Sequence, residues 1–387
     1  MAFQLVPLPP SLVDLVSPAD RRIWQALSLV PVKGALPLST DLSHSVLALA
    51  IGGGGLLLFV IARRVFSAGG VRIVARGIAM AGMLLAAVSV AQDATARGLI
   101  YWRWDPGEGP PPFGPFLNRN HFATWMVIAI PLCLGYLAAH ASVHQRHERA
   151  TLGVTWQKRL AGALDARSIW LAAAICLMLV GLVASLSRSG IVGLASALLL
   201  GAYLRSRRTH TGAATWGLAA LVIALGAAVL RGNVWQIYER FGAAGSATVY
   251  RMNIWRATLE VAQDFWLTGS GAGTLPTVML VYQRTPSLFR INSAHNHYLQ
   301  VAAEGGLLIG IPVAIALALF VRTSSTALAQ DDSGMYFLRA GALSGLFGVA
   351  VQSIWDVGLT TPANAVLAAL AAAITVHRSA PRLRPEA

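Results

Sequence analysis

Charged residues are scarce in this sequence. Asp, Glu, Lys and Arg together make up 12% of its 387 residues, whereas an average soluble domain carries about 25%. Hydrophobic residues make up 56%, and the mean hydropathy is +0.60. This composition excludes a disordered chain and argues against an ordinary soluble enzyme.

Cysteine and targeting signals are also sparse. The two cysteines, Cys133 and Cys176, lie inside long apolar runs, so they indicate neither a disulfide framework nor a redox compartment. The first residues lack the basic segment of a cleavable signal peptide, and prolines at positions 7, 9 and 10 interrupt their apolar stretch. Any export of the chain must therefore depend on internal spans.

Long apolar runs are abundant. A membrane span needs about 17–25 mostly apolar residues, and its backbone must pair internally, as in a helix. The sequence therefore predicts an all-α, polytopic integral membrane helical bundle. Nine runs qualify: 44–62, 73–91, 122–140, 168–186, 189–204, 213–230, 298–320, 335–355 and 359–376.

The net charge of +14, from 30 basic and 16 acidic residues, raises nucleic acid as a partner. Basic residues, however, concentrate in the predicted loops 63–76, 146–167 and 205–208 and in the tail 377–387. By the positive-inside rule this side faces the cytoplasm. Topology thus explains most of the surplus charge, and we expect no nucleic acid.

This orientation places residues 1–43 outside as an external N-terminal segment. A polar segment with no preceding span is difficult to translocate, so we expect one or two helices to be missing before it. The alternative is a protein whose N-terminus is truly external.

The external segment 231–297 is far longer than the usual connection of about 4–6 residues. Five apolar residues recur within it at helical spacing, which predicts a helix lying on the membrane surface: Met252, Trp255, Leu259, Ala262 and Trp266. Its basic residues are all arginines, whose planar fork suits bidentate binding of phosphate. We therefore expect a phosphate-bearing lipid substrate. The arginines are Arg231, Arg240, Arg251, Arg256, Arg284 and Arg290.

Several residues at the predicted outer interface have both a structural and a functional interpretation. Arg188 joins two spans and is either an interfacial anchor or a substrate contact. His295 begins a span next to Asn296 and Tyr298, which suit helix capping and an aromatic belt. His-x-His alone is a weak metal signal, so we expect no metal. Glu304 inside that span should face an arginine or a helix terminus.

A glycine-rich stretch, 269–273, superficially resembles a phosphate loop. It follows a predicted helix instead of a strand and lacks the lysine of a P-loop, so nucleotide binding is excluded. The stretch remains suited to close backbone approach or to donating amides to an anion.

Taken together and in their order along the chain, these motifs resemble those of the bacterial O-antigen ligase and O-antigen (polysaccharide) polymerase superfamily. The resemblance covers about residues 180–376. The matching pieces are Ser187-Arg188-Ser189-Gly190, Arg251-x-x-x-Trp255, Gly269-x-Gly271-x-Gly273, His295-Asn296-x-Tyr298-Leu299, Glu304-Gly305-Gly306, Asp356 and Pro362.

The resemblance implies an inverting, metal-independent glycosyltransferase without cofactors, in residues 44–376, within the bacterial inner membrane. Its donor would be a glycan on undecaprenyl pyrophosphate and its acceptor, on the periplasmic face, a glycan or lipid A–core. Arg188 and Arg251 would hold the pyrophosphate, and His295 would act on the acceptor. The remaining substrate-binding residues would be Asn296, Tyr298, Arg256, Glu304 and Asp356.

Two other functions remain open at this point. A transporter or flippase of an anionic glycolipid would show inverted halves with midplane charges, and neither is visible. A protein O-oligosaccharyltransferase shares the same motifs, and the absence of a large C-terminal soluble domain mildly disfavours it. The motifs do not distinguish the acceptors.

Overall fold

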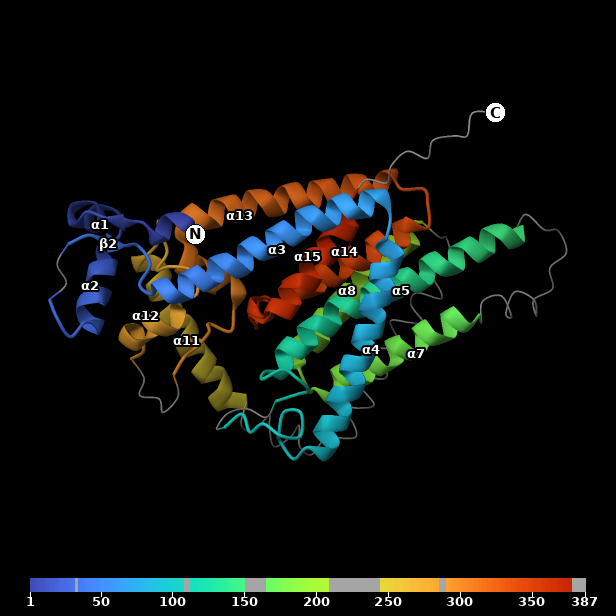
Figure 1. Cartoon of the computed structure of the whole chain (residues 1–387), viewed down its shortest axis with the longest axis horizontal. Helices are drawn as coiled ribbons and strands as arrows, with labels where there is room; N and C mark the ends of the chain where they lie inside the picture. The colour runs from blue at the N-terminus through green and yellow to red at the C-terminus, as the bar shows by residue number, and fades with distance from the viewer. Residues whose placement is uncertain (32–33, 108–111, 150–164, 209–243, 285–289, 378–387) are drawn as a thin grey trace. The chain divides into compact units, whose positions relative to one another are not determined.

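The computed structural model describes all residues except 32–33, 108–111, 150–164, 209–243, 285–289 and 378–387 (Figure 1). The chain divides into two compact units. The first, here the loop unit, comprises Met1–Leu56, Asn233–Val321 and Ser353–Val357. The second, the bundle unit, comprises Leu57–Gly232, Arg322–Gln352 and Gly358–Ala387.

The bundle unit is built around one buried helix, α5. Every residue from 122 to 133 on α5 is buried, and α4, α7, α8, α14 and α15 all pack against it. Burial on all sides explains why this stretch is apolar all round instead of amphipathic. The helices are α4 (Val71–Thr95), α5 (Arg119–Arg149), α7 (Ala166–Ala184), α8 (Arg188–Ser206), α14 (Met335–Gln352) and α15 (Pro362–Val376), with a short 3₁₀ turn at Gly358–Thr360.

Glycines allow α14 to approach its neighbours closely. A Cβ on Gly135 of α5 would lie 2.3 Å from the carbonyl oxygen of Phe337, and one on Gly348 would lie 2.5 Å from that of Gly193 on α8. Small residues at such crossings are typical of membrane helix packing, because lipid offers no hydrophobic force to bring helices together.

The loop unit combines short elements with parts of longer helices. Its core is small and includes Ile23, Ile254, Val261, Phe265 and Leu275. The elements are η1 (Ala2–Leu5), α1 (Pro10–Val16), α2 (Pro18–Leu27), α11 (Ala244–Asp264), α12 (Leu275–Tyr282) and the antiparallel strands β1 (Pro7–Leu8) and β2 (Leu36–Pro37). Helices α3 (Leu42–Ala68) and α13 (His297–Gln330) contribute residues to both units.

The predicted all-α membrane bundle is confirmed. Of the described helices, α3, α4, α7, α8, α13 and the part of α5 up to Ser142 are long and apolar enough to cross a membrane. Helices α14 and α15 coincide with the last two predicted spans, and α15 is a shorter apolar helix. The predicted span 213–230 lies outside the described residues.

Candidate functional site

Helix α13 is broken at Gly306, where φ is 54° and ψ is −162°. The amides after the break, Leu307 and Leu308, donate to the carbonyl oxygens of Trp266 and Leu267 at 2.8 and 3.0 Å. Unpaired backbone groups are costly in an apolar medium, so an irregular turn is tolerated where other backbone satisfies it. The segment after α11 supplies that backbone.

The glycine stretch 269–273 donates hydrogen bonds to the carbonyl groups that precede the break in α13. The amides of Ser270 and Gly271 donate to the carbonyl oxygens of Ala303 and Glu304 at 3.0 and 3.1 Å. Gly269 has φ +69°, and a Cβ on it would lie 2.2 Å from the Glu304 carbonyl oxygen. The predicted close backbone approach is therefore present, and its partner is the broken helix.

The carboxylate of Glu304 accepts three hydrogen bonds. Its donors are the amides of Gly273 and Leu275, at 2.9 and 3.2 Å, and Gln300 Nε2 at 3.1 Å. Leu275 is the first residue of α12, so the partner is a helix N-terminus, as predicted. The group that these amide donors bind is therefore the chain's own Glu304 side chain.

Gln300 links Glu304 to the segment that carries His295. Its Oε1 accepts from the amide of Ala294 at 3.1 Å, while its Nε2 donates to Glu304. Asn296 caps α13, because its Oδ1 accepts from the amide of Leu299 at 3.0 Å. These contacts fix the backbone on both sides of His295.

His295 occupies an unusual position. Its φ is +50°, a left-handed conformation that non-glycine residues seldom adopt. Its ring is partly buried, and Nδ1 is enclosed without a hydrogen-bond partner among the described residues. Burial lowers the pKa of His295, and the positive charge of Arg251 lowers it further. The imidazole is therefore neutral at physiological pH, the form that accepts a proton.

Arg251 lies on α11, which has two apolar faces. Ile254, Val261 and Phe265 are buried in the loop-unit core. Met252, Leu259 and Trp266 are 42–58% exposed. Three of the five residues of the predicted stripe therefore face outward, whereas Trp255 is partly buried and Ala262 packs against the loop-unit core. Arg256, five residues beyond Arg251, is exposed.

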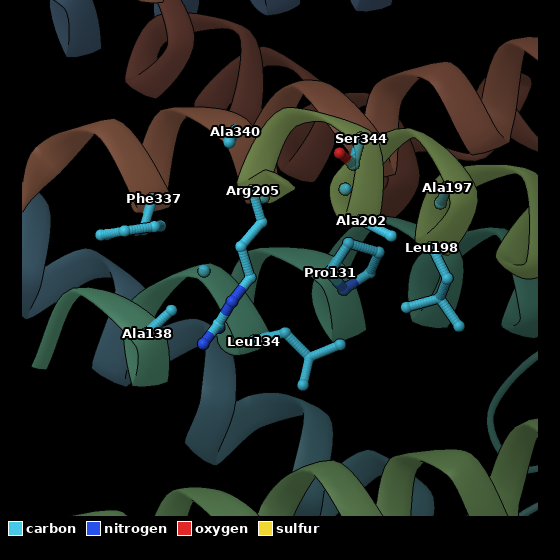
Figure 2. A pocket seen from close by; sticks show the side chains of 13 residues that line it. Pro131, Leu134, Ala138, Ala197, Leu198, Ala202, Arg205, Phe337, Ala340 and Ser344 are labelled. Atoms are coloured by element: carbon cyan, nitrogen blue, oxygen red, sulfur yellow. The ribbon is translucent and has the colours of Figure 1, made fainter. Parts of the chain in front are cut away.

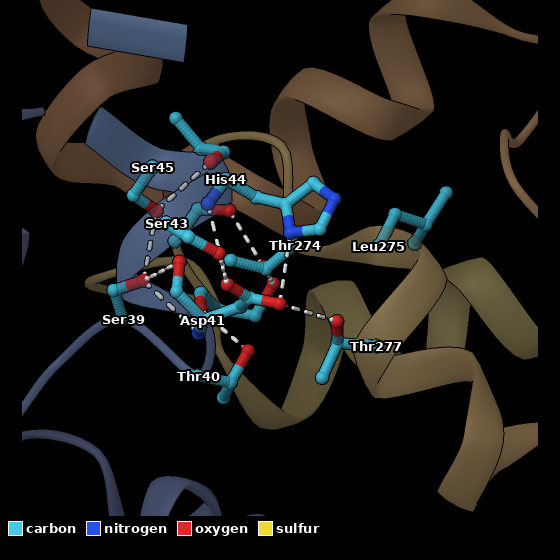
Figure 3. Close-up of polar contacts among 12 residues, drawn as sticks. Ser39, Thr40, Asp41, Ser43, His44, Ser45, Thr274, Leu275 and Thr277 are labelled. Carbon is cyan, nitrogen blue, oxygen red and sulfur yellow. Dashed lines mark hydrogen bonds and ion pairs between the residues drawn. The ribbon is translucent and has the colours of Figure 1, made fainter. Parts of the chain in front are cut away.

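A polar cluster that the sequence did not reveal supports the glycine stretch (Figure 3). Asp41 accepts from the hydroxyls of Ser43 and Thr277 and from the amide of His44, and one of its oxygens lies 2.8 Å from His44 Nδ1. Burial would raise the pKa of Asp41, but these hydrogen bonds outweigh it and lower the pKa to about 2. Ser45 Oγ donates to the carbonyl oxygen of Ala272 at 2.9 Å.

The N-terminal segment also contacts the glycine stretch. Gln4 Nε2 donates to the carbonyl oxygens of Thr268 and Glu304 at 2.7 and 2.9 Å. The amide of Thr40 donates to the carbonyl oxygen of Ser270 at 2.9 Å. The sequence does not predict these contacts, because the partners of Gln4 and Thr40 lie more than 200 residues away in the chain.

Arg188 belongs to the bundle unit. It is the first residue of α8, and its side chain is exposed. The preceding Ser187 accepts from the amide of Gly190 at 3.2 Å and donates to Asn120 Oδ1 at 2.8 Å. Gln352 of α14 donates to the Asn120 carbonyl oxygen at 3.2 Å. Three helices thus fix the turn that presents Arg188.

The structure brings Arg251 and His295 within electrostatic reach of one another, in the loop unit. Asn296, Glu304 and Asp356 belong to the same unit, and Asp356 is buried. Tyr298, also in this unit, is half-exposed.

Two pockets offer alternative sites. One, of about 200 Å³, lies between α5, α8 and α14, with an apolar lining apart from Arg205 and Ser344 (Figure 2). The other, of about 370 Å³, lies between α2, α11 and α12, where Arg22 pairs with Asp264 and Arg284 with Glu260. Neither contains a predicted catalytic residue, and within the described ranges no three His, Cys, Asp or Glu side chains group as metal ligands.

One segment of the chain matches a known protein family. Residues 173–314 match the family model described as O-antigen ligase. The matched segment contains Arg188, Arg251, His295 and Glu304, whereas Asp356 lies beyond it. No curated protein matches the chain. The resemblance predicted from the motifs is therefore confirmed by the family model.

Proposed function

We propose that this multi-pass membrane protein transfers a glycan from undecaprenyl pyrophosphate to an acceptor hydroxyl, because residues 173–314 match the family model described as O-antigen ligase. The reaction takes place at the periplasmic face of the bacterial inner membrane. The acceptor is lipid A–core or a growing polysaccharide. The observation that carries this proposal is that a partly buried His295 lies within electrostatic reach of Arg251, and that both belong to the matched segment.

In the proposed step, the acceptor oxygen attacks the anomeric carbon as its proton passes to His295. The bond from that carbon to the pyrophosphate oxygen breaks, and undecaprenyl pyrophosphate leaves. A single displacement of this kind inverts the anomeric centre. Nδ1 of His295 is the enclosed ring nitrogen, which leaves Nε2 as the atom that reaches the hydroxyl. A positioned base of this type contributes about 10²–10⁴-fold.

Negative charge grows on the pyrophosphate as the glycosidic bond breaks. Arg251 and, by the resemblance, Arg188 stabilise that charge, because a guanidinium pairs bidentately with phosphate oxygens and is always protonated. These two residues require no metal or cofactor for this role.

The contacts of Glu304 support a positioning role in the proposed reaction. Its carboxylate is engaged by two backbone amides and Gln300, and Gln300 in turn holds the amide that precedes His295. We propose that Glu304 orients His295 through Gln300, while Tyr298, Arg256, Asn296 and Asp356 complete the substrate site.

A genetic experiment tests the function. In a deletion strain, lipopolysaccharide, capsule or exopolysaccharide, and glycoproteins are analysed side by side, and the class that loses its glycan or chain length identifies the acceptor. Complementation with His295→Gln should fail while the protein still accumulates in the membrane. His297→Gln, the matched control two residues away, should restore the glycan. A glycan profile unaffected by the deletion would contradict the proposal.

A further inference from the structure

Three arginines gather where α3 turns into α4, in the bundle unit. Arg63 and Arg64 lie near the end of α3, and Arg72 is the second residue of α4. A pocket of about 320 Å³ opens on one face of α3, lined by Val60, Arg63, Arg64 and Ser67. A second pocket, of about 440 Å³, shares Ser67 and includes Arg72.

The charged side chains that line these two pockets are arginines. Neither lining contains Asp or Glu, and no ion pair joins Arg63, Arg64 or Arg72 to an acidic side chain in the described part of the chain. The residue before α4 is Gly70, which has no side chain to cap the helix; the amides of Ile73 and Val74 donate to its carbonyl oxygen, and those of Val71 and Arg72 precede them. Guanidinium groups and free helix amides are both donors to phosphate.

The surroundings of the arginines are apolar and exposed. Ile61 and Val65 on α3 and Ile73 on α4 face outward beside them, on helices long enough to cross a membrane. In a bilayer such side chains contact acyl chains, and arginines at the helix ends reach the headgroups. This arrangement suits an amphiphile with an anionic head more than a free anion in solution.

We propose that the α3–α4 turn binds the headgroup of an anionic phospholipid. Arg63 and Arg64 contact one phosphate, and Arg72 with the first amides of α4 contacts a second anionic group in the adjoining pocket. Two pockets that both include Ser67 in their linings favour a lipid with two phosphates over a lipid with one. The predicted orientation places this turn at the cytoplasmic leaflet, where basic clusters near membrane helices attract anionic lipids. The site is independent of glycan transfer.

Native mass spectrometry of the full chain, purified in a non-ionic detergent, tests the site. The protein is incubated with cardiolipin, phosphatidylglycerol or phosphatidylcholine, and lipid retention is measured for each. We expect retention in the order cardiolipin, phosphatidylglycerol, phosphatidylcholine. Each basic residue contributes roughly fivefold, so the triple variant Arg63→Gln/Arg64→Gln/Arg72→Gln should lose at least about tenfold in cardiolipin affinity.

Arg322→Gln is the matched control, because Arg322 is an exposed arginine on α13 that lines neither pocket. It should bind cardiolipin like the wild type, and the thermal transition of each variant verifies that it is folded. Equal retention of phosphatidylcholine and cardiolipin, or an equal loss in Arg322→Gln, would overturn the proposal. Displacement of cardiolipin by millimolar inorganic phosphate would overturn it too, since it would reveal a site for free anions.

Discussion

Glycine serves opposite purposes in the two units. In the bundle unit, Gly135 and Gly348 keep helical geometry and only remove a side chain, so that two helices touch through their backbones. In the loop unit, Gly269 and Gly306 adopt positive φ and end regular structure. The bundle is held by apolar burial and close packing, whereas the candidate site is held by hydrogen bonds between segments far apart in sequence. Stability and function should therefore respond differently to the same substitution.

The largest effect should come from a side chain placed in the bundle contact. Gly341→Val would put a Cβ 2.3 Å from the carbonyl oxygen of Pro131 on α5, so the helices must separate and we expect little folded protein. Gly77→Ala is the control, because nothing lies within 4 Å of its Cβ. Detergent-solubilised yield by size exclusion measures both, and normal yield of Gly341→Val would contradict the packing account.

Gly269→Ala should instead reduce glycan transfer without reducing the amount of folded protein. Its Cβ would meet the Glu304 carbonyl, and alanine disfavours φ +69°, so the glycine stretch should shift. We expect at least about 100-fold loss of glycan transfer, as for other misplaced catalytic groups, with normal yield from the membrane. A variant that fails to accumulate would show that the loop unit and the bundle fold as one.

Glu304→Gln should have an intermediate effect. It replaces one acceptor oxygen with a donor facing backbone amides, and a buried polar group left without its hydrogen-bond partner costs about 1–3 kcal/mol. We expect about 10–100-fold lower kcat with little change in KM for the donor, since the residue acts through His295. Glu260→Gln, at an exposed ion pair with Arg284, should change kcat less than twofold.

The acid limb of the pH profile of kcat/KM should lie at lower pH than an ordinary histidine would give. Because burial and Arg251 lower the pKa of His295, kcat/KM should stay constant as pH falls below the usual histidine value of about 6.5 and decline only further into acid. Arg251→Gln removes one of the two causes, so the acid limb of its residual activity should move to higher pH. An unchanged limb would show that Arg251 does not act on His295.

The smallest effect concerns the cluster around Asp41. Its folded pKa of about 2 lies below its ordinary value of 3.8, so its carboxylate stabilises the fold above pH 4, and this contribution is lost as pH falls towards 2. Asp41→Asn should lower stability by about 1 kcal/mol at neutral pH, after allowing for partial exposure. The thermal transition of the variant and wild type should converge in acid.

The sequence predicts those features of the structure that depend on residues close together in the chain. Hydropathy located the helices of the bundle, and the position of Glu304 within a span predicted an arginine or a helix terminus as its partner, of which the structure shows the helix terminus. The break at Gly306 was not predicted, because its replacement hydrogen bonds come from residues 266–271, far away in sequence. The Asp41–Thr277 contact spans 236 residues, and no local pattern encodes it. Likewise, periodicity found the apolar stripe of α11 but not the buried face that Ile254 and Val261 form.

The most direct test of the central claim is transfer by the purified chain in proteoliposomes. A lipid-linked glycan donor and the acceptor identified genetically are supplied, and release of undecaprenyl pyrophosphate is measured together with the glycosylated product. The wild type and His297→Gln should form both at similar rates, with inverted anomeric configuration, and His295→Gln should be at least about 100-fold slower. Equal rates for His295→Gln and the wild type, or glycan movement across the bilayer without any new glycosidic bond, would contradict the account.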